Sequence, residues 1–213
     1  MPSEHCATLT DALRPPGPPT ALLGDARLAA GVHCLEDADS DLRRYLYLEP
    51  HSALSFGGSM GVLVPYVPTP YEVVREMLRL AKVGKDDVVF DLGCGDGRIL
   101  ITAAREFGAR AVGIELRKDL VEQCIKNVRE AGLEDRILVI EGDFFDFDLS
   151  EATVVTLYLL TTVNEKLRPK LERELRPGAR VVSHDFEIVG WKPKVSKSID
   201  ESYRSHKIYL YQV

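Results

Sequence analysis

The chain has 213 residues, of which 45% are hydrophobic and 28% are charged, and this supplies enough apolar material for one well-packed core. Its net charge of −6 argues against non-specific binding of nucleic acid, because neutralising phosphates requires clustered Lys and Arg. Residues 1–65 hold 8 acidic and 4 basic side chains, so most of the negative charge lies there and the remainder is nearly balanced.

The first 60 residues differ from the rest of the chain. They include a segment rich in Pro, Gly and Ala and the acidic run EDADSDLRR. We therefore expect residues 1–61 to form an N-terminal extension that is flexible or loosely docked, followed by a folded domain over 62–213. Acidic residues and prolines interrupt every apolar stretch near the start, so we expect no signal peptide. Glycines and prolines also break the nearly uncharged stretch 51–70, and we expect no membrane span there.

The first strong local pattern lies in residues 69–108. A helix is predicted to open at Thr69 or Pro70 and to end at Gly84. The sequence DVVFDLGCGDGR, residues 87–98, then predicts a short buried strand and a tight glycine turn, followed by a helix that stops at Gly108. In an α/β sheet such a turn lies at the carboxyl edge, where ligands bind.

The spacing of the glycines indicates which ligand this turn suits. A dinucleotide fingerprint needs a third glycine where this chain has Arg98, and the spacing here is Gly-x-Gly-x-Gly instead. The carboxylates of Asp91 and Asp96 oppose a phosphate but suit a cation. S-adenosylmethionine carries an ammonium, a sulfonium and no phosphate, so it fits this turn.

Two further acidic positions follow the next strands. The strand predicted over 110–116 ends near Glu115, whose carboxylate can accept hydrogen bonds from both hydroxyls of an adenosine ribose. The strand 137–140 is followed by Asp143 and Phe144, a carboxylate for an adenine amino group beside an aromatic ring. The alternatives are a solvated glutamate at a strand end and a phenylalanine in the core.

The run Asp91–Gly97, together with Glu115 and Asp143–Phe144, resembles the cofactor site of class I methyltransferases. The closer similarity is to archaeal-type broad-specificity protein-lysine methyltransferases and their relatives with mitochondrial substrates. It rests on the segments PYVPTPYEVV (65–74), VVFDLGCGDGRILITAA (88–104), 151–193 and the terminal IYLY (208–211).

The resemblance implies a Rossmann-like α/β fold with a mostly parallel seven-stranded sheet, helices on both faces and an antiparallel C-terminal strand. It makes residues 62–213 the methyltransferase domain and S-adenosylmethionine the cofactor. The implied cofactor-binding residues are Tyr66, Thr69, Asp91, Gly93, Gly95, Gly97, Glu115, Asp143 and Phe144.

The second half of the chain continues the alternation of strands and helices. A strand over 153–160 leads to a helical stretch closed by Pro177-Gly178, which we expect to be split at Pro169 because proline disfavours a helix interior. Strands are then predicted over 180–188, 195–199 and 206–213. The resemblance implies that the last of them form an antiparallel hairpin.

The candidate catalytic residues follow the fourth predicted strand. Methyltransferases that act on amides or bases often place Asn or Asp, two prolines and an aromatic residue there, but this chain reads YLLTTVN without prolines. Base or amide methylation therefore loses support. Tyr158, Thr161 and Asn164 become candidates for orienting an amine, with a core tyrosine and a helix-capping asparagine as the structural alternatives.

His184 and Trp191 are the candidate substrate-binding residues. Both follow a predicted strand, and Trp191 can wall a lysine channel or hold an ammonium by a cation-π contact. The alternatives are a hydrogen-bonded histidine and a tryptophan packed under the sheet. The five histidines and four cysteines show no metal-ligand spacing, so we expect no metal.

Together these patterns predict an enzyme that transfers a methyl group from S-adenosylmethionine to the ε-amine of protein lysines with broad specificity. The alternatives are a small-molecule or RNA methyltransferase and a non-catalytic module that binds S-adenosylmethionine. The expected partners are proteins with exposed lysines, without nucleic acid or membrane. We expect a cytoplasmic location, and the oligomeric state stays open with a monomer favoured.

Overall fold

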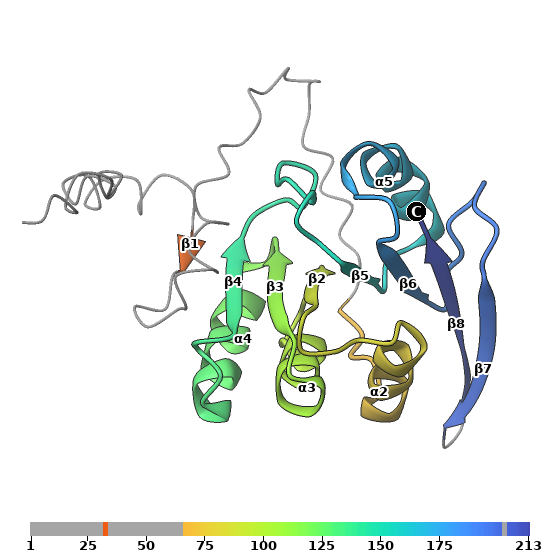
Figure 1. Ribbon diagram of the computed structural model, residues 1–213. Coiled ribbons are helices and arrows are strands. Elements are labelled where there is room, and N and C mark those ends of the chain that lie inside the picture. The colour runs from red at the N-terminus through yellow and green to blue at the C-terminus, as the bar shows by residue number, and fades with distance from the viewer. Residues whose placement is uncertain (1–31, 34–65, 202–203) are drawn as a thin grey trace, which may run out of the picture.

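The computed structural model describes residues 32–33, 66–201 and 204–213 (Figure 1). Apart from the two-residue strand β1 (Val32–His33), the predicted N-terminal extension lies outside the described residues. Strand β1 pairs antiparallel with β4 (Ile137–Glu141) and so lies at one edge of the sheet.

The sheet has the strand order β1-β4-β3-β2-β5-β6-β8-β7. Its centre consists of five parallel strands, which are β2 (Val88–Leu92), β3 (Arg110–Glu115), β4, β5 (Val154–Leu157) and β6 (Arg180–His184). Strands β7 (Val195–Glu201) and β8 (Arg204–Gln212) form the final antiparallel hairpin, and β8 pairs antiparallel with β6. The predicted seven-stranded, mostly parallel sheet is confirmed, with β1 added at its edge.

Helices cover both faces of the sheet. Helices α2 (Tyr71–Leu80), α3 (Arg98–Phe107) and α4 (Lys118–Ala131) lie along one face, whereas α5 (Thr161–Glu174) lies on the other (Figure 1). Each face has its own apolar core, because residues of a strand point alternately to the two sides. Val89 on β2, for example, packs with the three-helix side, and its neighbour Phe90 packs with the α5 side.

The prediction that the helical stretch after β5 splits at Pro169 is wrong. Helix α5 runs from Thr161 to Glu174 with Pro169 inside it. Proline has no N–H to donate to the carbonyl of Glu165, which costs a helical hydrogen bond. Leu167 and Leu171, on either side of the proline, are both fully buried, and this packing keeps the helix continuous.

The strand order reverses between β2 and β5, which are parallel neighbours although β3 and β4 lie between them in the sequence. In such a sheet the crevice beyond the carboxyl ends of these two strands is the usual ligand site. The glycine turn after β2 and Tyr158 after β5 both lie at this point. No helix among the described residues is long and apolar enough to span a membrane.

Candidate active site

The glycine turn after β2 is held against the end of β3. The backbone N–H groups of Gly93 and Cys94 both donate to the carbonyl of Ile114, at 2.8 and 3.2 Å. Gly93, Gly95 and Gly97 all have positive φ, between 55° and 83°, a conformation that side chains disfavour. The glycines therefore serve the backbone path of the turn, as their spacing predicted.

Two of these glycines also allow close approach by neighbouring side chains. A Cβ at Gly97 would lie 2.4 Å from Sγ of Cys124 on α4, and a Cβ at Gly95 would lie 2.6 Å from the ring of Tyr66. The third glycine thus lets α4 pack against the start of α3, and the second lets Tyr66 lie on the turn. The structure thus places the ring of Tyr66 against the glycine turn, and its contact with the cofactor stays a prediction.

Glu115, the last residue of β3, is only 8% exposed. Its Oε2 accepts a hydrogen bond from the N–H of Gly95 at 3.0 Å, and its Oε1 accepts one from the N–H of Arg117 at 2.9 Å. The carboxylate is thus fixed between the glycine turn and the start of α4. Carboxylate oxygens have further lone pairs, so this geometry leaves acceptor capacity for hydroxyl groups of a ligand.

Asp91 is a buried carboxylate at the centre of the site, 3% exposed on β2. Thr156 of the neighbouring strand β5 donates a hydrogen bond to its Oδ1 at 2.7 Å. Burial raises the pKa of Asp91 to about 7, and the nearby carboxylates of Glu115 and Asp96 add to that rise. No cationic side chain among the described residues forms an ion pair with Asp91, so its ionised form needs a positively charged ligand.

The other carboxylate of the turn, Asp96, has a different role from the one its sequence position indicated. Arg98 pairs with it through Nη2 at 2.7 Å and Nε at 2.9 Å. Burial would raise the pKa of Asp96, but the hydrogen bonds and the charge of Arg98 outweigh burial and hold it below its usual range. Because Arg98 neutralises this charge, Asp91 is the carboxylate that remains for a cationic ligand.

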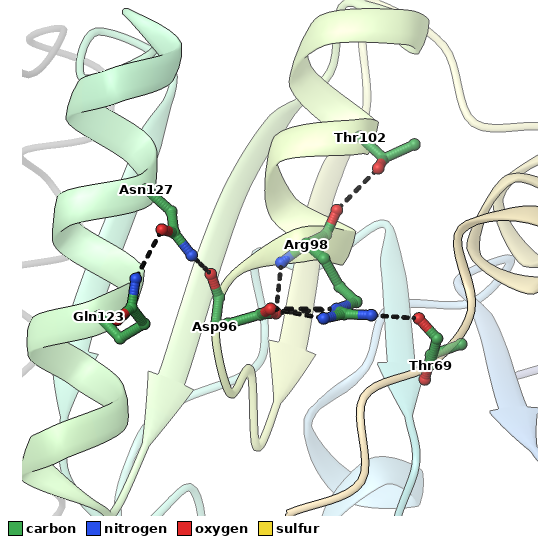
Figure 2. A network of polar contacts seen from close by, with 6 residues as sticks. All are labelled: Thr69, Asp96, Arg98, Thr102, Gln123 and Asn127. Carbon is green, nitrogen blue, oxygen red and sulfur yellow. Dashed lines mark hydrogen bonds and ion pairs between the residues drawn. The ribbon is translucent and has the colours of Figure 1, made fainter.

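Figure 2 shows how this ion pair organises the surrounding elements. Arg98 also donates from Nη1 to the carbonyl of Thr69 at 2.9 Å, which ties the segment before α2 to the turn. On the other side, Asn127 of α4 donates to the carbonyl of Asp96 at 2.8 Å and accepts from Gln123 at 2.8 Å. The network joins the segment at Thr69, the turn and two helices into one frame.

Asp143 and Phe144 follow β4 at the same edge of the sheet. Asp143 accepts a hydrogen bond at Oδ1 from the N–H of Phe145 at 3.0 Å, which fixes the turn after the strand. The rings of Phe144 and Phe145 lie 4.9 Å apart, and Phe144 packs partly against the core on the α5 side. Asp143 and Phe144 therefore follow the strand that lies on the far side of β3 from β5, and their contact with an adenine stays a prediction.

Tyr158, Thr161 and His184 lie on the opposite side of the switch point. Tyr158 follows β5, Thr161 begins α5, and the ring of Tyr158 stacks on His184 at a centroid distance of 3.9 Å. Nδ1 of His184 is 3.2 Å from Oγ1 of Thr69, so the segment before α2 reaches this side too. Burial, together with the charge of Asp185, raises the pKa of Tyr158, which is therefore a neutral phenol at physiological pH.

Asn164 and His184 offer no surface to a substrate in this structure, since both are 0% exposed. The amide of Asn164 donates to Ser183 and to the carbonyls of Phe186 and Glu187 at 3.3 to 3.4 Å. It thereby ties α5 to the turn after β6. The alternative of a helix-capping asparagine is wrong, because Leu160 is the N-cap and Asn164 lies inside α5.

The structure does not place Trp191 beside His184, the other candidate substrate-binding residue. Its indole N–H donates to Glu172 at 2.7 Å, and its ring lies 5.6 Å from that of Tyr211. Glu172 is eleven residues along α5 from Thr161, which corresponds to roughly 16 Å of helix. Trp191 thus packs beside the far end of α5, as in the alternative reading of a tryptophan packed against the sheet.

Sequence reasoning missed a polar cluster next to Tyr158. His184, Asp185 and His206 offer three ligand atoms that all lie within 4.8 Å of one another. Burial lowers the pKa of His184 to about 4, and the charge of Asp185 opposes this only in part. The two histidines are 22 residues apart on separate strands, so no sequence spacing could have revealed the cluster.

The fold, the glycine turn, buried Asp91 and Glu115 define a class I S-adenosylmethionine-dependent methyltransferase. The family model for the ANTKMT methyltransferase domain matches residues 91–195. A protein-lysine N-methyltransferase from Saccharolobus islandicus is 54% identical over 151 residues, which cover 70% of this chain and 94% of that relative. The chain belongs to this protein-lysine N-methyltransferase family.

Two other similarities bear on the substrate. The adenine nucleotide translocase lysine N-methyltransferase of Mus musculus is 36% identical over 61% of this chain, and the match spans only 56% of the mouse protein. A crystal structure described as an RNA methyltransferase from Salinibacter ruber, in complex with S-adenosyl-L-homocysteine, is 52% identical. It superposes with a TM-score of 0.64 and covers 68% of this chain and 93% of that chain.

Proposed function

We propose that this protein transfers methyl groups from S-adenosylmethionine to the ε-amines of lysines in proteins, with broad specificity and in the cytoplasm. The observation that carries the cofactor assignment is the buried carboxylate of Asp91, which has no cationic partner among the described residues. The lysine assignment is supported by the 54% identical relative from Saccharolobus islandicus, because the match covers 94% of that relative's length. The free thiols of Cys94 and Cys124 support a reducing compartment.

The residues present fit the cofactor chemically. Asp91 would hold a cationic group, Glu115 would accept from ribose hydroxyls, and Asp143 with Phe144 would face the adenine. Tyr66 and Thr69 would close the pocket over the glycine turn. When bound, S-adenosylmethionine supplies an electrophilic methyl carbon on its sulfonium.

The chain's own residues must then make a lysine amine reactive. A lysine with a pKa near 10.4 is almost wholly protonated at pH 7, which costs about 4.6 kcal/mol before attack. A pocket that excludes water lowers this pKa, and the half-buried ring of Tyr158 can help to exclude it. We assign Tyr158 and Thr161 the role of orienting the amine through their oxygens, with Asn164 and His184 bracing the wall behind them.

RNA methylation is the second candidate, because the similar structure from Salinibacter ruber is described as an RNA methyltransferase. The net charge of −6 favours the lysine reading, since RNA binding requires a cluster of basic side chains to neutralise phosphates. A protein substrate makes no such demand.

The test is to incubate the pure protein with methyl-labelled S-adenosylmethionine and a cell extract, and then to divide the products. We expect the label to be lost on protease treatment, to survive ribonuclease, and to appear as methyl-lysine after acid hydrolysis. Label that disappears with ribonuclease would establish the RNA reading instead. A protein that binds the cofactor but labels nothing would be a non-catalytic module.

A further inference from the structure

The cluster formed by His184, Asp185 and His206 lies where β6 ends beside β8. The three candidate ligand atoms are Nε2 of His184, Oδ2 of Asp185 and Nδ1 of His206. The two nitrogens are 2.9 Å apart, and the carboxylate oxygen is 3.5 Å from Nε2 and 3.6 Å from Nδ1. Both histidines are buried, and the cluster belongs to no part of the cofactor site described above.

This triangle has the dimensions of one face of a metal coordination tetrahedron. With bonds of about 2.0 to 2.1 Å, the edges of a tetrahedron around Zn²⁺ measure about 3.3 Å. The observed edges of 2.9, 3.5 and 3.6 Å lie on both sides of that value. An ion at bonding distance from all three atoms would lie roughly 0.6 Å out of their plane, with its fourth position open.

The outer contacts of the three groups are those that metal ligands usually have. Nδ1 of His184 meets the hydroxyl of Thr69 at 3.2 Å, and Nε2 of His206 faces Glu201 at 3.9 Å. Oδ1 of Asp185 accepts the N–H of Lys207 at 2.9 Å. Each group thus has a partner at the atom that points away from the triangle, and such partners orient the ligating atom.

The backbone supports the same reading. Asp185 has a φ of +61°, a left-handed conformation that residues other than glycine rarely adopt and that concentrates at functional positions. This conformation allows the Asp185 side chain to face both histidines directly after the strand ends.

We propose that His184, Asp185 and His206 bind one divalent transition-metal ion, with Zn²⁺ as the best fit to two imidazoles and one carboxylate in tetrahedral arrangement. The proposal does not depend on the proposed substrate. Since Tyr158 stacks on His184, the ion would lie beside the wall of the candidate substrate pocket.

Arg204 competes for this site. Its Nη2 donates to Oδ2 of Asp185 at 2.5 Å, the same oxygen that an ion would bind. The Arg204 side chain is 56% exposed, so it can turn into solvent when an ion enters. Removing the guanidinium should therefore tighten metal binding, whereas removing a ligand should weaken it. These opposite effects separate the proposed site from adventitious binding.

The experiment uses the full chain without a histidine tag, stripped of metal with EDTA, and Zn²⁺ alone as titrant in a calorimeter. We expect one Zn²⁺ per chain, at least tenfold weaker binding in His206→Gln and Asp185→Asn, and several-fold tighter binding in Arg204→Gln. Asp135→Asn removes an exposed carboxylate outside the cluster and is the matched control for Asp185→Asn, with binding unchanged. Binding of S-adenosyl-L-homocysteine by each variant shows that it is folded.

Equal Zn²⁺ affinity in the parent and His206→Gln proteins would overturn the proposal, as would absence of binding in both the parent and Arg204→Gln proteins. Co²⁺ gives a second measurement that needs no variant of a buried residue. The proposal expects the intense visible absorption of tetrahedral Co²⁺ without a thiolate charge-transfer band. A thiolate band or a weak octahedral spectrum would place the ion elsewhere and overturn it.

Discussion

At the scale of single residues, Glu115 braces the glycine turn, and the proposed function gives it a second task, accepting hydrogen bonds from the ribose of the cofactor. Replacing Glu115 with Ala should weaken S-adenosyl-L-homocysteine binding by about 1 to 3 kcal/mol, since charge-assisted hydrogen bonds are lost. Isothermal titration calorimetry measures this directly. Glu122→Ala, on the exposed side of α4, is the control and should bind as the parent protein does. An unchanged affinity in Glu115→Ala would remove the role given to this carboxylate.

Asp91 makes cofactor affinity depend on pH. Its pKa is about 7 in the ligand-free protein because burial disfavours the ionised form, whereas a cationic ligand favours that form. Affinity for S-adenosylmethionine should therefore rise as pH increases through 7. Titrations between about pH 5 and 6.7 follow this rise while about nine tenths or more of the ligand's amino groups stay charged, since their pKa is about 7.7 to 8.0. The Asp91→Asn variant should bind weakly and without this dependence, and an equal pH slope in both proteins would contradict the assignment.

The raised pKa of Asp91 changes the stability of the ligand-free protein in the opposite direction, so that its contribution to stability falls as pH rises. The pKa of Asp91 is raised above its ordinary value of 3.8, so the folded state binds the proton more tightly than the unfolded state does. The stability that this proton contributes is fully present below pH 3.8 and is lost as pH rises through about 7. The ionised form of Asp91 thus lowers the stability of the ligand-free protein at neutral pH, and such a cost is common at functional sites.

The local structure around the site was predictable from sequence where the partner is local or the pattern is periodic. The glycine turn follows directly from the spacing of its glycines, and the places of Asp91 and Glu115 near the ends of β2 and β3 follow from the apolar strand patterns. Their roles in holding the cofactor stay predictions. The pairing of Asp96 with Arg98 was missed although they are only two positions apart, because Asp96 was weighed against a ligand and Arg98 only as the residue in place of a glycine. The cluster at His184 depends on strand pairing between β6 and β8, which no local pattern encodes.

At the scale of elements, the packing of α4 against the glycine turn depends on Gly97. Gly97→Ala should lower the free energy of unfolding by about 2 to 4 kcal/mol, because φ is +80° and the new Cβ would meet Cys124 Sγ. Urea unfolding measures the change. Gly132→Ala is a matched control with φ +64° and no neighbour within 4 Å, so it should lose only the conformational part of about 1 kcal/mol.

A second variant separates the backbone strain at Gly97 from the steric clash with Cys124. In a Cys124→Ala background the sulfur is gone, so Gly97→Ala should cost little more there than Gly132→Ala costs in the parent. An equal cost of Gly97→Ala with and without the sulfur would mean that close approach of α4 is not what the third glycine provides.

Element boundaries were predicted well in the first half of the sheet and less well after β5. Strand β2, the turn and α3 form from contiguous residues whose patterns agree, so local reasoning sufficed. Helix α5 was predicted to break because proline was weighed by propensity alone, whereas burial of Leu167 and Leu171 decides the outcome. Trp191 lies on a segment whose course depends on its contacts with α5 and β8, which sequence could not supply.

At the scale of the whole molecule, the mostly parallel sheet and its antiparallel hairpin were predictable because they came with a family resemblance, whereas the strand order was not predicted. Alternating strands and helices indicate a parallel sheet, but they do not fix which strand lies beside which. The order that places β5 next to β2 is what creates the crevice, and the side chains of both strands then meet in the hydrogen bond between Thr156 and Asp91.

Ligand-linked stability tests this arrangement as a unit, because binding to the folded state alone raises the unfolding temperature. At about 100 times its Kd, S-adenosylmethionine should add about 2.7 kcal/mol and raise the Tm by roughly 5 to 10 °C for a domain of this size. NAD⁺ should give no shift, since its pyrophosphate would meet the carboxylates of Asp91 and Glu115 without a cation to balance them. Thermal unfolding with each ligand gives the comparison, and the Asp91→Asn variant should lose most of the S-adenosylmethionine shift. A comparable shift with NAD⁺ would show that this crevice takes phosphate-bearing nucleotides, and the reading of Asp91 as the partner of a cation would fail.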